Sequence, residues 1–321
     1  MANYVKIATI GPSPPQVPSK MKPQEIVDFM LEFWRQKFEQ VLPDKPDLIV
    51  VPEICDLPAP NGFDLQRCQQ YYRQRKNQIR DFFAQTAKKN NCYIVYCSVR
   101  EAEDGVFYNS SVILDRKGKV AGIYNKNYLV PEERTKERTK DGILCGKDAP
   151  IIECDFGRVA CLVCFDLNFD QLREKYIREK PDLLIFSSMY HGGDIVQSNW
   201  AYSCRSHFVS AVPDLPCEIR NPYGAVIASS TNYLDYSVGK VNLDCCMVHY
   251  DFNYEKLNAL KKKYGNKVNI HDPGYFGSVL IFSETDETTA VDMAGEFEIE
   301  LLDDYLTRGL SLHQKPENIE N

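Results

Sequence analysis

Residues 156–169 read FGRVACLVCFDLNF, and this stretch does most to decide the fold. Its first half is a continuous apolar run, which is typical of strands that are buried on both faces in a parallel sheet. The run ends at Cys164, and the residues after it predict a helix over 168–179. A reactive side chain therefore follows the carboxyl end of a strand, where α/β proteins build their sites.

Two further reactive side chains follow predicted strands. Residues 47–53 read DLIVVPE, so the carboxylate of Glu53 comes directly after a continuously apolar strand. Lys126 ends a predicted hairpin over 106–126, whose turn, residues 115–118, contains an Asp and a Gly that suit tight turns. The three positions offer a nucleophile, a base and a cation.

Helices alternate with these strands along most of the chain. Apolar residues at helical spacing predict helices over 23–42, 64–89 and 195–207, and a second hairpin is predicted over 217–230. Two successive units of strand, helix, strand, helix and hairpin predict one α/β domain built from two similar halves with mixed sheets. We expect this domain to span residues 1–285. The acidic tail, 286–321, is expected to fray or to pack on a partner subunit.

The composition excludes several classes of partner. The 321 residues carry a formal charge of −7, which argues against binding to nucleic acid or to an anionic membrane surface. No apolar stretch is long enough to span a bilayer, and residues 1–12 lack a signal-peptide pattern, so we expect a cytoplasmic protein.

The twelve cysteines are expected to be mostly buried free thiols. Cys161 and Cys164 form a CxxC pair, but they lie in a strand-like run, where positions three apart face opposite sides of the sheet. The chain offers no second pair to complete four zinc ligands, so we expect no metal site there.

The chemistry of a cysteine nucleophile explains why the other two residue types are needed. A thiol with a pKa near about 8.5 is only partly ionised at neutral pH, so it needs a base or a neighbouring cation. Burial of Glu53 would raise its pKa towards the range of efficient proton transfer. Lys126 and the backbone N–H of Phe165 could donate to the oxygen that becomes negative in the tetrahedral intermediate. A helix beginning just after Cys164 would also favour the thiolate through its N-terminal dipole.

Taken together, these stretches resemble the nitrilase, or carbon–nitrogen hydrolase, superfamily, whose Glu-Lys-Cys order is reproduced by Glu53, Lys126 and Cys164. The resemblance is carried by LIVVPE (48–53), YNSSVILDRKGKVAGIYNKNYL (108–129) and FGRVACLVCFDLNF (156–169), with support from 181–188 and 221–228. It implies a four-layer α-β-β-α sandwich, catalysis without a cofactor, and a homodimer or higher homo-oligomer.

Many members of the superfamily carry a second glutamate beyond the lysine, and Glu133 is the candidate for it here. Its implied role is to orient the lysine and the substrate, although Glu132 and Glu137 are close enough in sequence to compete for the role. His191 follows another predicted strand end and is a candidate for substrate binding. The alternative is that it is solvated, as most histidines in loops are.

The resemblance also implies a substrate class. Phe165 and Asp166, which follow the cysteine, resemble the amidase branch of the superfamily more than the Trp-Glu of true nitrilases. A small carboxamide is therefore the expected substrate, with an N-carbamoyl compound or a nitrile as alternatives. The segment between Arg205 and Asn221 is shorter than in most members of the superfamily. The alternative to an enzyme is a binding or regulatory protein that has the nitrilase fold but turns over no substrate.

Overall fold

The computed structural model of the protein describes residues 1–59, 65–102, 106–134 and 142–320. The chain divides into two compact units. The larger unit is Val5–Val241, and the smaller combines Met1–Tyr4 with Asn242–Asn321. Each unit is built around its own sheets.

The larger unit contains two six-stranded sheets. Its elements are β1 (Tyr4–Ile10), α1 (Pro23–Val41), β2 (Leu48–Val50), α2 (Leu65–Arg75), α3 (Gln78–Asn90), β3 (Tyr93–Glu101), β4 (Phe107–Leu114), β5 (Val120–Asn125), α4 (Pro131–Arg134), β6 (Ile152–Cys154), β7 (Gly157–Val163), α5 (Asp170–Glu179), β8 (Leu183–Ser187), α6 (Ile195–Cys204), β9 (His207–Ala211), β10 (Glu218–Arg220), β11 (Val226–Ser229) and β12 (Tyr236–Asn242).

The two sheets repeat the same topology, which confirms the prediction of two similar halves. In the first sheet, of order β12-β1-β2-β3-β4-β5, β1, β2 and β3 are parallel and β4 and β5 return antiparallel. In the second sheet, of order β11-β10-β9-β8-β7-β6, the parallel strands are β7, β8 and β9, and β10 and β11 are antiparallel.

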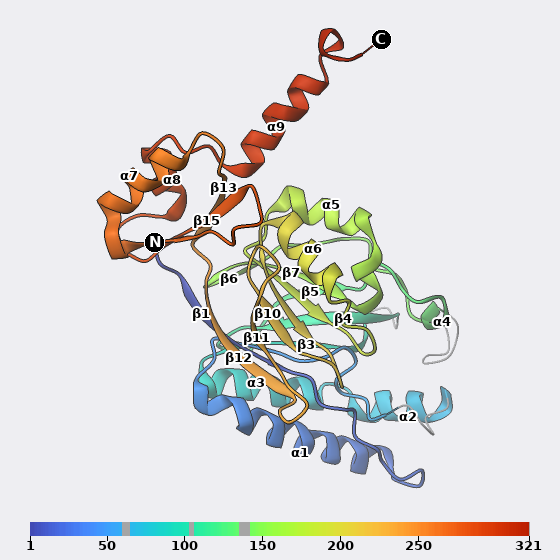
Figure 1. Cartoon of the computed structure of the whole chain (residues 1–321). Coiled ribbons are helices and arrows are strands. Elements are labelled where there is room, and N and C mark those ends of the chain that lie inside the picture. The colour runs from blue at the N-terminus through green and yellow to red at the C-terminus, as the bar shows by residue number, and fades with distance from the viewer. Residues whose placement is uncertain (60–64, 103–105, 135–141, 321) are drawn as a thin grey trace. The chain divides into compact units, whose positions relative to one another are not determined.

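The sheets pack face to face with helices on their outer faces, so the predicted four-layer sandwich is confirmed. Figure 1 shows α1 and α3 along one side of the sheets and α5 and α6 along the other. Buried hydroxyl groups join the inner faces: Thr9 donates to the carbonyl oxygen of Ser210 at 2.6 Å, and Ser187 donates to that of Val51 at 2.9 Å. These bonds satisfy polar groups that would otherwise be buried without partners.

The amphipathic faces of α1 and α3 explain why they cover the first sheet. Trp34 and Phe38 of α1 and Phe83 of α3 are almost fully buried, and the Trp34 and Phe83 rings meet edge to face with centroids 5.7 Å apart. They pack into one apolar cluster with Ile10 and Ile49 of the sheet. Burial of such rings and branched side chains stabilises the layer by about 1.5–3 kcal/mol for each side chain.

The single helix expected over 64–89 is instead two helices. Lys76, between α2 and α3, has a φ of +43°, which is left-handed and cannot continue a right-handed helix. The apolar residues keep a helical spacing across this break, so the sequence pattern alone does not reveal it. The break places the end of α2 and the start of α3 beside one another.

The smaller unit contains a three-stranded sheet of order β13-β15-β14. Its elements are β13 (Cys245–His249), α7 (Tyr254–Tyr264), β14 (Val268–His271), β15 (Ser278–Ser283), α8 (Ala290–Glu296) and α9 (Leu302–His313). Residues 242–285, expected within the hydrolase domain, thus form one unit with the acidic tail. Within that tail, α8 buries Ala290, Met293 and Ala294 in the apolar cluster of this unit. Among the described residues, no helix is both long and apolar enough to cross a membrane.

Candidate active site

The candidate nucleophile lies at the carboxyl end of β7, which is parallel to its neighbour β8. β7 and β8 pair in register with Val163 opposite Ser187, so Cys164 and Ser188 both leave the sheet at the same edge. From the other sheet, Glu53 follows β2, and its N–H donates to the carbonyl oxygen of Ser188 at 3.3 Å. Strand register therefore brings residues from positions 53, 164 and 188 to one place.

The backbone at Cys164 has a special conformation. Its φ is +48°, which is uncommon for a residue with a side chain, and a 3-10 helix, Cys164–Asn168, begins there. α5 begins only at Asp170, so the sequence-based expectation of a helix over 168–179 placed its start too early. The helical N-terminus at Cys164 is therefore that of the short 3-10 helix and not that of an α-helix. The sharp turn instead turns the chain away from β7 at the sheet edge.

Lys126 lies between two carboxylates. Its Nζ donates to Oε1 of Glu53 at 2.9 Å and to Oε2 of Glu133 at 2.7 Å. The exposed fractions of the three side chains are 1% for Lys126, 4% for Glu53 and 11% for Glu133. An ammonium group has three donors, so the two carboxylates engage two of them and fix the direction of the third.

Asn109 of β4 connects the same two carboxylates from a second side. It is fully buried, and its Nδ2 donates to Oε1 of Glu53 at 2.7 Å and to Oε1 of Glu133 at 2.9 Å. The N–H of Lys126 donates to the carbonyl oxygen of Asn109 at 2.8 Å, because β4 and β5 are neighbouring strands. One amide side chain thus sets the positions of both glutamates.

The four-residue helix α4 positions Glu133. The N–H of Val130 donates to its Oε2 at 3.0 Å, and its own N–H donates to the carbonyl oxygen of Val130 at 2.9 Å. Of the alternatives for the second glutamate, Glu132 is exposed, and Glu137 lies outside the described residues. Among the described residues, Glu133 is the acidic side chain of this segment that reaches Lys126.

Asp166 connects the two loops that carry Cys164 and Lys126. It is fully buried and accepts hydrogen bonds from the Tyr124 hydroxyl at 2.7 Å, the Tyr128 N–H at 2.8 Å and the Val163 N–H at 2.9 Å. Burial raises the pKa of its carboxyl to about 7, although these three hydrogen bonds oppose the shift. Asp166 therefore holds the segments of Val163, Tyr124 and Tyr128 together.

A cavity of about 630 Å³ opens at these strand ends. All six sequence-predicted site residues line it: Glu53, Lys126, Glu133, Cys164, Phe165 and His191. Apolar side chains supply much of the remaining wall: Ile54, Val130, Leu167, Met189 and Val196. His191 is exposed at this wall, and the Phe165 ring packs edge to face on Phe169 with centroids 5.1 Å apart. The volume is within the usual range for small-molecule sites.

The electrostatics of the cavity favour a neutral thiol. Burial raises the pKa of Cys164 to about 11, and the carboxylate of Glu53 adds to this effect. The cation of Lys126, a hydrogen bond from the Ser188 side chain and one from the backbone of Met189 oppose the shift. The pKa of Lys126 is raised because the two glutamates outweigh its burial, so this side chain stays charged.

Sequence reasoning missed Asn109, Ser188 and Met189 at this site. Asn109 lies within the YNSS segment of a hairpin, and Ser188 and Met189 follow a strand end as Glu53 and Cys164 do, which was the available signal. Within the described ranges, no group of three or more His, Cys, Asp or Glu side chains is arranged to hold a metal ion.

Comparison with known proteins identifies the family of the chain. The sequence profile of the carbon-nitrogen hydrolase family matches residues 6–211, which is more than half of the chain. The chain belongs to the carbon–nitrogen hydrolase family. The nitrilase superfamily resemblance predicted from Glu53, Lys126 and Cys164 is therefore confirmed, as is the assignment to a family of hydrolases with amidase-type relatives.

Individual relatives are distant. The hydrolase in the agr operon of Staphylococcus aureus is 28% identical over 137 residues, which cover 43% of this chain and 50% of that protein. An omega-amidase of Danio rerio is 22% identical over 147 residues, which cover 45% of this chain and 52% of that protein. The chain thus spans about half the length of the curated relatives it matches.

Solved structures show the shared fold. An amidase from Nesterenkonia sp. superimposes with a TM-score of 0.59 at 16% identity, covering 81% of this chain and 96% of the amidase. The NitFhit protein of C. elegans gives a TM-score of 0.61 at 14% identity, covering 93% of this chain and 98% of that chain. At these identities the likeness concerns the fold alone.

Proposed function

We propose that this protein hydrolyses the carbon–nitrogen bond of a small carboxamide, with Cys164 as nucleophile, Glu53 as base and Lys126 as oxyanion donor. One observation carries the proposal: a single cavity of about 630 Å³ exposes all three side chains to the same small molecule. The relatives named as amidases support the reaction class. A variant of the Nesterenkonia amidase is described with acrylamide added at its active-site cysteine, which supports a cysteine nucleophile here.

In the first half of the reaction, the Cys164 sulfur attacks the amide carbon while Glu53 takes the thiol proton. A base is required because a thiol with a pKa of about 11 holds little thiolate at neutral pH. Negative charge then develops on the carbonyl oxygen, which accepts hydrogen bonds from Lys126 and the N–H of Phe165. Glu53 returns the proton to nitrogen, ammonia leaves, and a thioester remains.

In the second half, water replaces ammonia in the cavity. Glu53 takes a proton from the water, which attacks the thioester carbon, and Lys126 again donates to the oxyanion. The carbon–sulfur bond then breaks, the carboxylic acid leaves, and Glu53 returns the proton to Cys164. Glu133 and Asn109 touch no reacting atom in this scheme and act by positioning Lys126 and Glu53.

The substrate class follows from the wall of the cavity. Its apolar side chains accommodate a small aliphatic or aromatic group, and Glu132, Asn168 and His191 add polar contacts. An N-carbamoyl compound or a nitrile would meet the same three catalytic groups. Phe165 and His191 are the residues proposed to contact the substrate.

The test is a screen of small carboxamides, N-carbamoyl amino acids and nitriles for released ammonia. We expect turnover of at least one carboxamide by the wild-type protein and none by Cys164→Ala. Cys161→Ala is the matched control, because Cys161 is fully buried within β7 and should affect stability alone. Residual activity near wild type in Cys164→Ala contradicts the proposal, and inactivity towards all three classes favours a binding or regulatory protein.

The proposal also includes a cytoplasmic location and a homo-oligomeric assembly for this protein. All twelve cysteines are free thiols, which suits the reducing environment of the cytoplasm. The helix α9 exposes Leu306, Leu310 and Leu312, so its apolar side chains offer a surface for a second copy in a homodimer or higher homo-oligomer. Size-exclusion chromatography with light scattering tests the assembly.

A further inference from the structure

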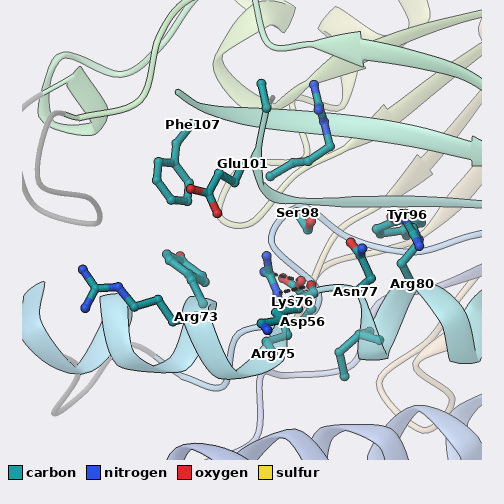
Figure 2. A pocket seen from close by; sticks show the side chains of 14 residues that line it. Asp56, Arg73, Arg75, Lys76, Asn77, Arg80, Tyr96, Ser98, Glu101 and Phe107 are labelled. Carbon is teal, nitrogen blue, oxygen red and sulfur yellow. Dashed lines mark hydrogen bonds and ion pairs between the residues drawn. The ribbon is translucent and has the colours of Figure 1, made fainter. Parts of the chain in front are cut away.

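A second cavity, of about 710 Å³, lies outside the site described above. Figure 2 shows the end of α2 and the start of α3 along one side, with Arg73 and Lys76, and the strands that carry Glu101 and Phe107 along the other. No described residue lines both this cavity and the one containing Cys164. A ligand bound here would therefore occupy a separate site.

Some of the charged side chains around this cavity form ion pairs with described residues and others do not. Asp56 and Arg75 are buried and form an ion pair at 2.6 Å, so they neutralise each other. The other acidic side chain of the wall is Glu101, and four further cations line the cavity: Arg73, Lys76, Arg80 and Arg100. Arg80 forms an ion pair with Asp81 at 2.8 Å, whereas none of the other three forms an ion pair with a described residue. The cavity is therefore locally basic in a chain whose formal charge is −7.

Arg100 provides a more specific indication of a ligand. Its Nη2 donates to Oδ1 of Asn125 at 3.3 Å, but its Nε is buried and has no hydrogen-bond partner among the described residues. A buried N–H without an acceptor is costly, and guanidinium groups match the oxygen geometry of phosphate. An oxyanion in the cavity would supply the missing acceptor.

The rest of the wall suits a ring. Tyr72, Tyr96 and Phe107 contribute aromatic side chains, of which the two tyrosines are buried and Phe107 is half-buried, and the Tyr72 and Phe107 centroids lie 6.4 Å apart. Asn77, the N-cap of α3, also lines the cavity, and it makes no capping hydrogen bond through its side chain. The positive end of the α3 dipole thus adds to the basic side chains.

We propose that this cavity binds a small phosphate monoester that carries a flat ring. The phosphate contacts Arg73, Lys76 and Arg100, whose summed charge with Glu101 matches a phosphate dianion, and the ring contacts the aromatic wall. Arg73 and Lys76 are exposed, whereas Arg100 is half-buried and its Nε is buried. The binding site is independent of amide hydrolysis, so it can be tested without a known substrate.

Isothermal titration calorimetry of the full chain with adenosine monophosphate as the probe tests the proposal. We expect binding by the wild type and by Cys164→Ala, and at least about tenfold weaker binding by Arg73→Gln/Lys76→Gln. The matched control is Lys88→Gln/Lys89→Gln, which removes the same charge from exposed positions at the other end of α3 and should bind as the wild type does. Arg100→Gln should weaken binding as well.

Two further probes separate the phosphate from the ring. Adenosine, which lacks the phosphate, and inorganic phosphate, which lacks the ring, should each bind at least about tenfold more weakly than adenosine monophosphate. No binding of adenosine monophosphate to the wild type would overturn the proposal. Equal affinities for the site and control variants, or for adenosine and its monophosphate, would overturn it too.

Discussion

The amide nitrogen of Asn109 lies 2.7 Å from Oε1 of Glu53. The same nitrogen donates to Glu133 at 2.9 Å, so one buried side chain fixes both carboxylates that hold Lys126. Two carboxylates this close repel each other, and the amide and the ammonium together offset that repulsion. The geometry of the proposed base therefore depends on a residue from a different strand, β4.

Replacing Asn109 by Leu tests this dependence, because Leu has a similar size but donates no hydrogen bond. We expect kcat to fall by about 100-fold, since a displaced catalytic group loses much of its effect, and KM to change less. Ser111→Ala is the control, because Ser111 is also buried on β4 and lines neither cavity. A wild-type kcat in Asn109→Leu would show that Glu53 is positioned by other contacts.

Glu133 and Glu132 are adjacent in sequence and differ in their contacts. Glu133 accepts from Lys126 at 2.7 Å, whereas Glu132 is exposed, although both line the cavity. We expect Glu133→Gln to lower kcat by about tenfold or more, and Glu132→Gln to act mainly on KM. Steady-state kinetics of both variants on one working substrate decide the matter, and the reverse ranking would make Glu132 the second glutamate.

The sequence predicted three residues that follow strands or a hairpin, but it missed Ser188 and Met189, which also follow a strand, and Asn109, which depends on strand register. Glu53, Lys126 and Cys164 each come directly after an apolar run or a hairpin, and this local signal survives in a single sequence. Asn109 lies within a strand and is indistinguishable there from any buried polar residue. Its importance appears only when β4 is placed between β3 and β5.

A single sequence does not show long-range contacts or backbone conformation, and this explains two differences between the predicted and the observed fold. The break at Lys76 depends on a left-handed backbone conformation, which leaves no mark on the apolar pattern of the helix. Residues 242–285 form strands and a helix with ordinary patterns, and their grouping with residues 1–4 and with the tail in one unit depends on contacts between residues far apart in the sequence. Whether the hydrolase domain extends to residue 285 stays a prediction.

Loss of the Lys126 cation should affect the rate more than binding. Lys126→Met removes one oxyanion donor, so we expect kcat to fall by about 100- to 1000-fold with a smaller change in KM. The same change leaves two glutamates buried without their cation, which costs about 3–5 kcal/mol of stability. Lys117→Met, at an exposed turn position, is the control for charge removal.

Thermal melts separate the two effects of Lys126→Met. The double variant Lys126→Met/Glu133→Gln removes one of the unpaired carboxylates, so it should regain stability without regaining kcat. An increase in KM alone in a folded Lys126→Met protein would contradict the oxyanion role.

The pH dependence of alkylation reports the state of the nucleophile. The pKa of Cys164 is raised to about 11, so its thiolate fraction grows with pH throughout the accessible range. We expect iodoacetamide to label Cys164 about tenfold faster for each unit between pH 6 and about 9, without a plateau. Cys161 is fully buried and should label more slowly at every pH. Mass spectrometry of the two cysteines measures both rates, and a plateau near pH 7 would indicate a thiolate already formed at rest.

The last prediction separates a carboxylate base from the histidine base of papain-like hydrolases. His191 is the histidine that lines the described part of the active-site cavity, and burial lowers the pKa of His207 on β9 to about 4, so that ring stays neutral. Gln at position 53 keeps the shape of the side chain but cannot accept the thiol proton, so ammonia release should collapse in Glu53→Gln. Each histidine replaced by Ala should retain activity, with His191→Ala the one most affected in KM because of its place in the cavity wall. The measurement is ammonia release from six variants on one substrate. They are Glu53→Gln and the Ala variants of the five histidines: His191, His207, His249, His271 and His313. An active Glu53→Gln beside an inactive but folded histidine variant would falsify the assignment of the base.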